Sequence, residues 1–526
     1  MNNKLLKPLG LGLLTALSVA SQSAVAEGDA VSIINDKCVA CHAKESDTSW
    51  SRISHMRKTP EGWLGTIGRM QVMHGLEISS EERATVMKYL ADTQGLAPSE
   101  TEGYRYALEQ RMNTHEEFES GLFTEMCARC HSGARVKLQH RPESEWMHLA
   151  NFHIGQYPTI EYHALARDRD WWPIVKEQMV PMLGKQQPLE STAWSEWLKA
   201  GDEAVVGSWS VAGHMPAKGD LHAVMTVTEK EGDDMYAVAL EGAFADGTPL
   251  TGEGSAIVYT GYEWRASIKV GDETMRQVFA VQDGTMTGRM YSADDDSRGM
   301  DITAAVESGK ARVLAVQPAY IKAGTETELT IVGANLSGEP SLGKGVAVVK
   351  VLKSSDNLIK VLAKAGKAEG VNTVAVGTTS GAELAVYSSV AAVKVVPEFA
   401  VARVGGNGGS TAPVEARFDA EAWAAGKDGK AGTDDDFRIG FMPASWTAKA
   451  FDEQAAADED LKYAGTLSDN GVFSPAGAGP NPDRKMSTNN AGHLTVVGTV
   501  TDGDSSVEAE AELIVTVQRW NTPPIP

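Results

Sequence analysis

Cysteine is scarce in this chain of 526 residues, which contains only four. All four lie in two motifs of the form C-x-x-C-H, from Cys38 to His42 and from Cys127 to His131. A zinc site or a structural disulfide is the alternative interpretation of such pairs. It is weakened here because no cysteine remains outside the motifs. The thiol chemistry of the chain is therefore concentrated at two places.

Basic residues are fewer than acidic residues in this chain. The chain has 48 Lys and Arg against 70 Asp and Glu, which gives a net charge of -22. Removal of the first 26 residues, which contain two lysines and no acidic residue, leaves -24. Phosphate backbones and anionic lipid repel a protein with this charge, which argues against nucleic acid or an anionic membrane surface as partner.

Long hydrophobic runs are absent after the N-terminus, and no later stretch approaches the length of a transmembrane helix. At the N-terminus, Lys4 and Lys7 precede an apolar run over residues 9–20, which is too short to span a bilayer. Ala24 to Ala26 then offer an A-x-A cleavage site. We predict that residues 1–26 are a signal peptide and that the mature chain is periplasmic, without a membrane anchor.

Each C-x-x-C-H motif is the attachment signature of a c-type haem. In such a site two thiols add to the haem vinyl groups, and the adjacent histidine binds the iron from one side. We therefore expect two covalently bound haem c groups. The attaching thiols would be Cys38, Cys41, Cys127 and Cys130, and the proximal iron ligands His42 and His131.

The segments that follow the two motifs look like an internal repeat. Trp63 and Trp146 each follow a Pro-Glu pair, and alignment of the two tryptophans brings Met70 opposite His153, each seven residues further on. The distal ligand of a c-type haem is normally Met or His. We predict one His/Met haem and one bis-His haem, and their potentials should differ because a thioether raises the potential. With both positions filled, the pair would relay electrons and leave no site open for oxygen or peroxide.

Other side chains compete for the distal positions. Met73 and His74 lie just beyond Met70, and Met182 precedes a second helix-like run. None of the three gains support from the repeat. The other histidines of the region are expected at the surface or in packing, namely His55, His115, His140, His148 and His163.

The haem region is expected to span residues 27–200 as two mostly α-helical cytochrome c units, about 27–100 and 101–200. Ser79 to Glu82, followed by apolar residues at helical spacing, predict a capped amphipathic helix that closes the first unit. The run 189–198 is assigned the same role in the second unit. The polar stretch 91–102 is interpreted as the connector.

From about residue 201 the pattern changes to short alternating runs, including one over 256–270, separated by turn dipeptides. We predict three all-β domains, an antiparallel barrel over 201–310, an immunoglobulin-like sandwich over 311–396 and a C-terminal sandwich over 397–526. Nothing in them resembles a nucleophile–base pair. The acidic stretch from Asp428 to Asp436 could suggest calcium, but its spacing fits no EF-hand loop, and a polar turn is favoured.

Over essentially its full mature length the chain resembles the α (large, dihaem) subunit of bacterial quinohemoprotein amine dehydrogenase. The resemblance rests on the two haem motifs and on the order of one cytochrome domain and three β domains. It also rests on three strings, Asn151-Phe152-His153-Ile154-Gly155-Gln156-Tyr157-Pro158, Glu161-Tyr162 and Arg167-Asp168-Arg169-Asp170-Trp171-Trp172.

The resemblance implies a periplasmic αβγ heterotrimer that oxidises primary amines to aldehydes and ammonia. It implies a β-propeller subunit and a small subunit that carries the quinone, cysteine tryptophylquinone, so no catalytic residue is expected in this chain. The α subunit would pass electrons through its haems to a blue copper protein or a soluble cytochrome c. The family's one His/Met and one bis-His haem agree with the assignment from the repeat.

Two other functions remain open at this point. A free-standing dihaem carrier with β docking domains would purify as one chain. A dihaem peroxidase-like enzyme would need one iron to become five-coordinate. A pure adhesion or scaffold protein is hard to reconcile with two haem motifs.

Overall fold

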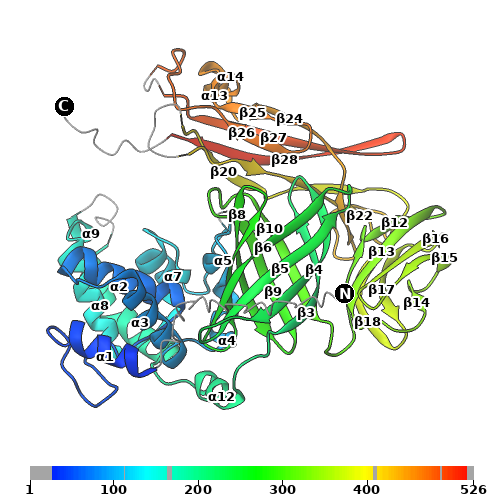
Figure 1. Ribbon diagram of the computed structural model, residues 1–526. Helices are drawn as coiled ribbons and strands as arrows, with labels where there is room; N and C mark the ends of the chain where they lie inside the picture. The colour runs from blue at the N-terminus through cyan, green and yellow to red at the C-terminus, as the bar shows by residue number, and fades with distance from the viewer. Residues whose placement is uncertain (1–26, 112, 163–168, 407–411, 486–488, 518–526) are drawn as a thin grey trace, which may run out of the picture.

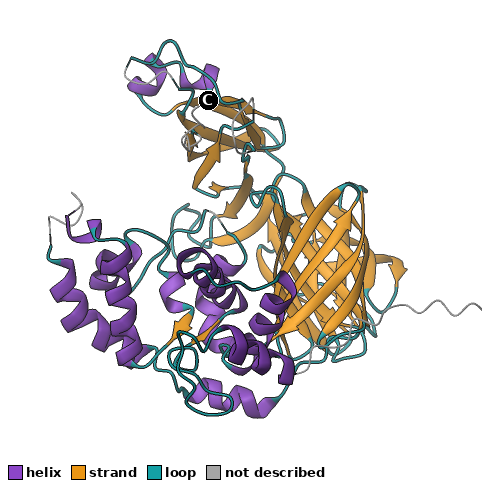
Figure 2. Cartoon of the chain, turned by 60° about the vertical axis from the view of Figure 1, so that its left-hand side comes forward, coloured by secondary structure: helices purple, strands orange, loops and turns teal. Residues whose placement is uncertain are grey.

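The computed structural model describes residues 27–111, 113–162, 169–406, 412–485 and 489–517. The predicted signal peptide, His163 and the segment 163–168 lie outside these residues. A mostly helical N-terminal region lies beside an eight-stranded barrel, and two further β domains follow (Figure 1, Figure 2). The predicted fold class is confirmed. Among the described residues, no helix is both long and apolar enough to cross a membrane.

The first helical unit consists of α1 (Glu27–Lys37), α2 (Pro60–His74) and α3 (Ser80–Thr93). As predicted, Ser79 caps α3. Its hydroxyl accepts the backbone N–H of Glu82, whose carboxylate accepts the N–H of Ser79. One barrel residue, Tyr259, joins the apolar core of this unit. The rest of that core is Ile34, Trp50, Met56, Trp63, Ile67, Val86, Leu90 and Ala91.

The second unit is assembled from shorter pieces around one long helix. They are α6 (Gly121–Phe123), the π-helix η2 (Thr124–Ala128), α7 (Ala134–Lys137), α8 (Glu143–Gln156), α9 (Thr159–Tyr162), α10 (Trp171–Ile174), the π-helix η4 (Val175–Met179) and α11 (Val180–Gln186). The run from α10 to α11 packs on α8 and closes the unit.

The prediction that residues 189–198 close the second unit is wrong. A helix is present there, α12 (Thr192–Ala200), but it packs beside α4 and the barrel. The Trp197 indole N–H donates to the carbonyl of Thr260 in the barrel at 2.9 Å. Trp197 therefore contacts the barrel, whereas Trp194 of the same helix lies against the guanidinium of Arg57 in the first unit.

The connector between the units is also less polar than predicted. Helix α3 continues to Thr93, and Leu96 and Ala97 are only 1% and 2% exposed. Three short helices follow, α4 (Pro98–Thr101), η1 (Glu102–Tyr104) and α5 (Arg105–Leu108). The units also meet through two short antiparallel strands, β1 (Arg57–Lys58) and β2 (Gln139–His140).

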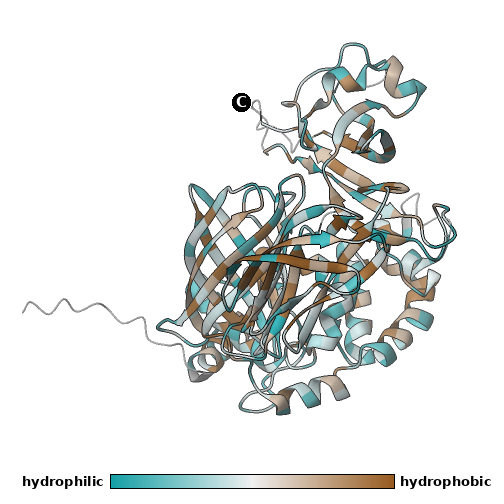
Figure 3. Ribbon diagram, turned by 90° about the vertical axis from the view of Figure 1, so that its right-hand side faces the viewer, coloured by the Kyte–Doolittle hydropathy of each residue, from teal (hydrophilic) through white to brown (hydrophobic). Residues whose placement is uncertain are grey.

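The predicted barrel is a closed sheet in the order β10-β3-β4-β5-β6-β7-β8-β9. Its strands are β3 (Gly207–Met215), β4 (Gly219–Glu229), β5 (Met235–Phe244), β6 (Pro249–Tyr259), β7 (Glu263–Val270), β8 (Glu273–Gln282), β9 (Thr285–Ser292) and β10 (Gly299–Val306). The run expected over 256–270 is two strands, since Thr260 and Gly261 turn the chain at positive φ. Hydrophobic and hydrophilic residues alternate along the barrel strands (Figure 3), as a filled barrel requires.

The next domain is a sandwich of two four-stranded sheets, β11-β13-β16-β15 and β12-β18-β17-β14. Its strands are β11 (Arg312–Gln317), β12 (Tyr320–Lys322), β13 (Glu326–Ala334), β14 (Pro340–Ser341), β15 (Val346–Ser354), β16 (Leu358–Ala365), β17 (Gly370–Val376) and β18 (Thr379–Tyr387). Aliphatic side chains from both sheets form its core. The immunoglobulin-like assignment stays a prediction.

The C-terminal domain has sheets β19-β22-β23, β20-β28-β27-β24 and β21-β26-β25. Its elements are β19 (Ala392–Val396), β20 (Phe399–Arg403), β21 (Ala416–Arg417), β22 (Asp419–Ala424), β23 (Phe437–Met442), β24 (Ser445–Ala450), α13 (Glu453–Ala457), α14 (Asp460–Tyr463), β25 (Gly465–Leu467), β26 (Val472–Pro475), β27 (Gly492–Asp502) and β28 (Ser505–Thr516). In the acidic loop, the carboxylates of Asp435 and Asp436 accept the backbone N–H groups of Lys427 and Gly432, at 2.5 and 2.6 Å. These bonds hold the loop in its turn conformation.

Buried or half-buried ion pairs join the domains. Arg105, from the connector, donates two hydrogen bonds to Glu263 of the barrel at 2.7 and 3.1 Å. His214 of the barrel lies between Asp220 and Asp419, at 2.8 and 3.0 Å, and so ties the barrel to the C-terminal domain.

Candidate haem-binding site

The first C-x-x-C-H motif begins at the C-terminal end of α1. The backbone N–H groups of Cys41 and His42 both donate to the carbonyl of Cys38, at 3.1 and 3.0 Å, so the motif closes on itself as a tight turn. The Nδ1 atom of His42 lies 2.9 Å from the carbonyl oxygen of Ser51. A carbonyl only accepts, so Nδ1 carries the proton and Nε2 keeps its lone pair for a metal.

The histidine of the second motif is oriented in the same way, although the local secondary structure differs. Cys127 lies in the π-helix η2, and His131 follows after two turn residues. The Nδ1 atom of His131 donates to the neighbouring carbonyl of Ser132 at 2.9 Å. Nε2 of this ring is again the nitrogen left to bind iron.

The four thiols occupy equivalent places in the two units. Cys38 and Cys127 are half-buried against the apolar cores, Cys41 and Cys130 are exposed, and all four are free. Burial raises the pKa of Cys38 to about 11 and that of Cys127 to about 12. Each motif therefore presents one packed thiol and one outer thiol, which suits attachment to the two edges of one flat group.

The internal repeat predicted from the two tryptophans is present in the structure. The indole N–H of Trp63 donates to the carbonyl of Gln94 at 3.1 Å, and that of Trp146 donates to the carbonyl of Gln187 at 3.4 Å. The same two carbonyls accept the backbone N–H groups of Lys58 and Arg141, both at 3.0 Å.

The two glutamine amides complete the repeat. The Gln94 side chain donates to the carbonyls of Ile53 and Met56, and the Gln187 side chain donates to three carbonyls before strand β2 and within it. Sequence reasoning missed both glutamines. Their signal is weak because one lies 31 residues after its tryptophan and the other 41.

The two candidate distal ligands lie at the same level of equivalent helices. Met70 is half-buried in the last turns of α2, and His153 is half-buried at the end of α8. His153 Nδ1 donates to the carbonyl of Leu149 at 2.8 Å, which leaves Nε2 free, and its ring lies 5.9 Å from that of Trp171. Burial lowers the pKa of His153, and nearby His131 lowers it further, so the neutral, metal-binding form is favoured.

The rival ligands are placed differently. Met73 is 48% exposed, and His74 is also exposed at the end of α2. Met182 is half-buried against the core of the second unit. Exposed apolar side chains lie in the first motif, on α2 and directly after α8, namely Val39, Leu64, Val72, Met73 and Tyr157. A haem would cover such apolar surface, so the residues present fit that group.

Three of the other described histidines of the haem region lie near carboxylates. His55 lies 3.0 Å from Glu45, and His148 lies 3.9 Å from Glu145. His115 lines a surface cavity of about 410 Å³ beside Ser132. His140 is 7% exposed and belongs to the contact between the units.

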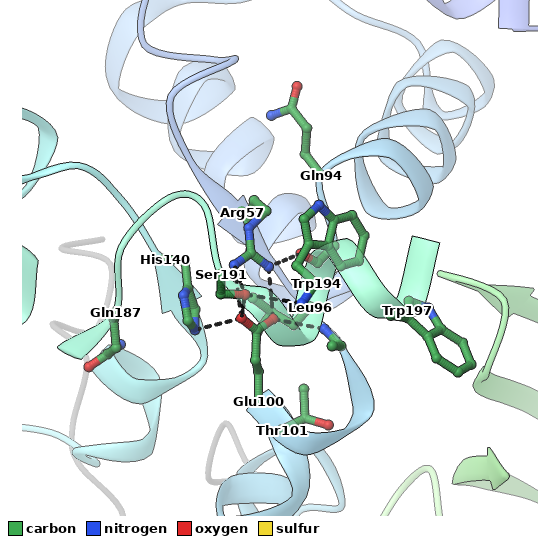
Figure 4. Close-up of polar contacts among 12 residues, drawn as sticks. Arg57, Gln94, Leu96, Glu100, Thr101, His140, Gln187, Ser191, Trp194 and Trp197 are labelled. Carbon is green, nitrogen blue, oxygen red and sulfur yellow. Dashed lines mark hydrogen bonds and ion pairs between the residues drawn. The ribbon is translucent and has the colours of Figure 1, made fainter. Parts of the chain in front are cut away.

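A buried ion pair holds that contact together (Figure 4). Arg57 of β1 donates two hydrogen bonds to Glu100 of α4, at 2.8 and 2.9 Å. Ser191 donates to the same carboxylate at 2.6 Å, and His140 Nε2 lies 3.5 Å from it. Although burial opposes ionisation, the hydrogen bonds from Arg57 lower the pKa of Glu100 to about 2. The carboxylate of Glu100, in the connector, is therefore held by Arg57 of the first unit and lies close to His140 of the second.

The Arg-Asp-Trp-Trp string serves packing as far as it is described. Trp171 is 5% exposed, and its indole donates to the carbonyl of Met126 beside the second motif at 3.1 Å. The backbone N–H of Trp172 donates to Glu161 at 2.5 Å. Arg167 lies outside the described residues.

Models of four consecutive domains of one family match the chain. The model described as quinohemoprotein amine dehydrogenase A, alpha subunit, haem binding, matches residues 27–194. Those for domains II, III and IV of the same alpha subunit match residues 202–307, 310–388 and 393–525. Among curated proteins, no relative matches.

Solved structures are similar over parts of the chain only. A redesigned β-barrel, mFAP1, shares 18% identity over 19% of this chain and 90% of its own, with a TM-score of 0.17. The EC1-3 fragment of mouse PcdhgC3 shares 12% identity over 47% of this chain and 78% of its own, with a TM-score of 0.18. Drosophila N-cadherin EC1-4 shares 11% identity over 56% of this chain and 69% of its own, with a TM-score of 0.21.

Proposed function

The chain belongs to the family of quinohemoprotein amine dehydrogenase alpha subunits, and we propose that it conducts electrons from a quinone on a partner subunit to an external acceptor. As the haem-binding subunit of that oxidoreductase, it would work in the periplasm, exported by its signal peptide. Its partners would be a β-propeller subunit and a small subunit that bears cysteine tryptophylquinone. The acceptor would be a blue copper protein or a soluble cytochrome c.

One observation carries the proposal. The two C-x-x-C-H motifs lie in two units with the same tryptophan–carbonyl framework, and in both motifs the histidine Nδ1 is engaged while Nε2 is free. Two equivalent sites in one domain suit a relay between two redox centres.

The residues of this chain would hold the haems in a defined way. Cys38 and Cys41 would attach the first haem, and Cys127 and Cys130 the second. His42 and Met70 would be the axial pair of the first iron, as His131 and His153 would be of the second. When bound, each haem iron supplies reversible one-electron transfer.

The remaining task of the chain is positioning. The Ser51 and Leu149 carbonyls fix the orientation of the His42 and His153 rings. The brace formed by Arg57 and Glu100 keeps the two sites at a constant separation, and the ion pairs to the barrel hold the relay against the scaffold. Oxidation of the amine would take place on the partner subunits.

The test uses the native complex, purified without removing its partners. A simple primary amine is added anaerobically, and the reduced haem bands are followed. We expect prompt reduction, together with smaller chains that copurify. A single chain that dithionite reduces but no amine reduces would contradict the proposal and leave a free-standing dihaem carrier.

A further inference from the structure

A buried lysine lies at the contact between the two haem units without a carboxylate partner. Lys58 of β1 is 4% exposed, and its Nζ atom donates to the hydroxyl of Thr66 at 2.7 Å. Among the described residues, no carboxylate lies within ion-pair distance of it, and the same Nζ atom lies over the ring of Trp63, 5.5 Å from its centroid. A buried ammonium group without a counter-charge is costly, because burial removes its hydration.

More positive charge surrounds Lys58. Burial lowers its pKa well below the ordinary value, and four cations lower it further, in the order Arg141, Arg69, Arg135 and Arg52. Arg52 and Arg141 share the single carboxylate of Glu145, at 3.3 and 4.0 Å.

Arg69 is no better compensated than Lys58. Its Nη2 atom donates to the same Thr66 hydroxyl, at 3.2 Å, and that hydroxyl itself donates to the carbonyl of Gly62 at 2.8 Å. A neutral oxygen therefore receives two cationic donors. Burial and the charge of Arg135 lower the pKa of Arg69. No carboxylate is paired with Arg69 or Arg135 in the part of the chain that the structure describes.

The uncompensated cations converge on the second haem site. Arg69 immediately precedes Met70 on α2 of the first unit, and Arg135 lies four residues after His131. Strand β1, which carries Lys58, pairs with β2 of the second unit, where Lys58 lies opposite Gln139. A group held between His131 and His153 would thus meet cations contributed by both units.

We propose that Lys58, Arg69 and Arg135 form an anion site that binds the propionate carboxylates of the second haem. The site spans both units, since Lys58 and Arg69 come from the first and Arg135 from the second. The inference rests on the proposed haem attachment. A haem carries two carboxylates at one edge, and charge-assisted hydrogen bonds to ammonium and guanidinium groups neutralise both partners.

The first experiment compares midpoint potentials of both haems in the native complex as a function of pH. The variants are Lys58→Met and Arg69→Met, with Lys58→Arg as the conservative replacement. Loss of a cation near a haem favours the ferric form and raises the pKa of a propionate. We expect a negative shift of the second haem potential in both Met variants, with a steeper pH dependence. The first haem should change less, and Lys58→Arg should retain the wild-type values.

The matched control is Lys88→Met. Lys88 also lies in the first unit and is largely buried, but Asp234 accepts its ammonium group at 2.7 Å and Asp92 pairs with it as well. We expect both haem potentials to stay at the wild-type value in this control. Arg69→Met guards against a folding defect of Lys58→Met, since Arg69 is only half-buried.

Three results would overturn the inference. Unchanged second-haem potentials in both Met variants would show that the cations do not contact the propionates. An equal shift in Lys88→Met would show a nonspecific effect. A wild-type potential that follows the concentration of inorganic phosphate would identify a soluble anion instead. Failure of the proposed function itself is distinguishable, since the wild-type complex would then lack two covalent haems.

Discussion

The first and second haem units use one framework but are built from different lengths of helix. In the first, three uninterrupted helices surround Trp63, and Tyr259 of the barrel completes the core. In the second, π-helices interrupt the chain on both sides of α8, and the core around Trp146 draws on haem-region residues alone.

The difference shows which features the repeat preserves. Each tryptophan indole and each strand amide meet on one glutamine carbonyl, so the framework depends on a backbone acceptor that any sequence supplies. The candidate ligand is a single side chain seven residues further along the same helix. It is Met70 in one unit and His153 in the other, and the framework tolerates either.

Removal of the haem-attaching thiols should change the two units more than any other substitution. In Cys38→Ala/Cys41→Ala and in Cys127→Ala/Cys130→Ala, we expect covalent haem to fall from two groups per chain to one. Haem content per chain is measured by absorbance after denaturation. Two haems in either double variant would contradict attachment at that motif. The pair of variants also tells which unit survives without its haem.

Replacement of Met70 by His should make the two haems alike. A thioether raises the haem potential, so Met70→His should shift the first haem negative, within the ~0.8 V range that axial ligands set. The Met–Fe(III) band at roughly 695 nm should disappear. Met73→Leu, on the exposed side of the same helix, is the control. If the band survives in Met70→His and is lost in Met73→Leu, the ligand is Met73.

The sequence predicted the repeat and the fold class, a mostly helical region followed by all-β domains, because these depend on local patterns. A C-x-x-C-H motif and a Trp seven residues before a Met or His are visible without tertiary structure. The closing helix of the second unit was placed wrongly, since the amphipathic pattern of α12 does not tell whether its apolar face meets a haem core or a barrel. The cluster of Lys58 and Arg69 could not be predicted from the sequence for a similar reason. Lys58 and Arg69 become neighbours only through Thr66.

The contact between the units should be sensitive to acid. Hydrogen bonds from Arg57 hold the folded pKa of Glu100 at about 2, against an ordinary value of 4.5, so this carboxylate contributes about 3 kcal/mol above pH 4.5. Because the folded pKa is the lower one, that contribution disappears as the pH falls from 4.5 towards 2. In Glu100→Gln, Arg57 stays buried without a charge partner. We expect a loss of about 3 kcal/mol at pH 7 and a flatter acid dependence.

Urea unfolding of the haem region, followed by haem absorbance at several pH values, measures this effect. The exposed carboxylate of Glu81 offers the control, Glu81→Gln, for which we expect the wild-type profile. An unchanged acid profile in Glu100→Gln would show that the ion pair between Arg57 and Glu100 does not hold the two units together.

Replacement of each framework tryptophan by phenylalanine should have the smallest effect and should rank the units. Each substitution removes one hydrogen bond from a glutamine carbonyl that keeps its bond to the strand amide, which costs about 0.5–1.5 kcal/mol. The Trp63 bond is shorter than the Trp146 bond, 3.1 against 3.4 Å, so Trp63→Phe should destabilise its unit more. Trp197→Phe removes an equally direct indole–carbonyl bond at the barrel, and should leave both haem spectra unchanged. The reverse order, with Trp146→Phe the more damaging, would mean that the interrupted helices of the second unit depend on their tryptophan more than the continuous helices of the first do.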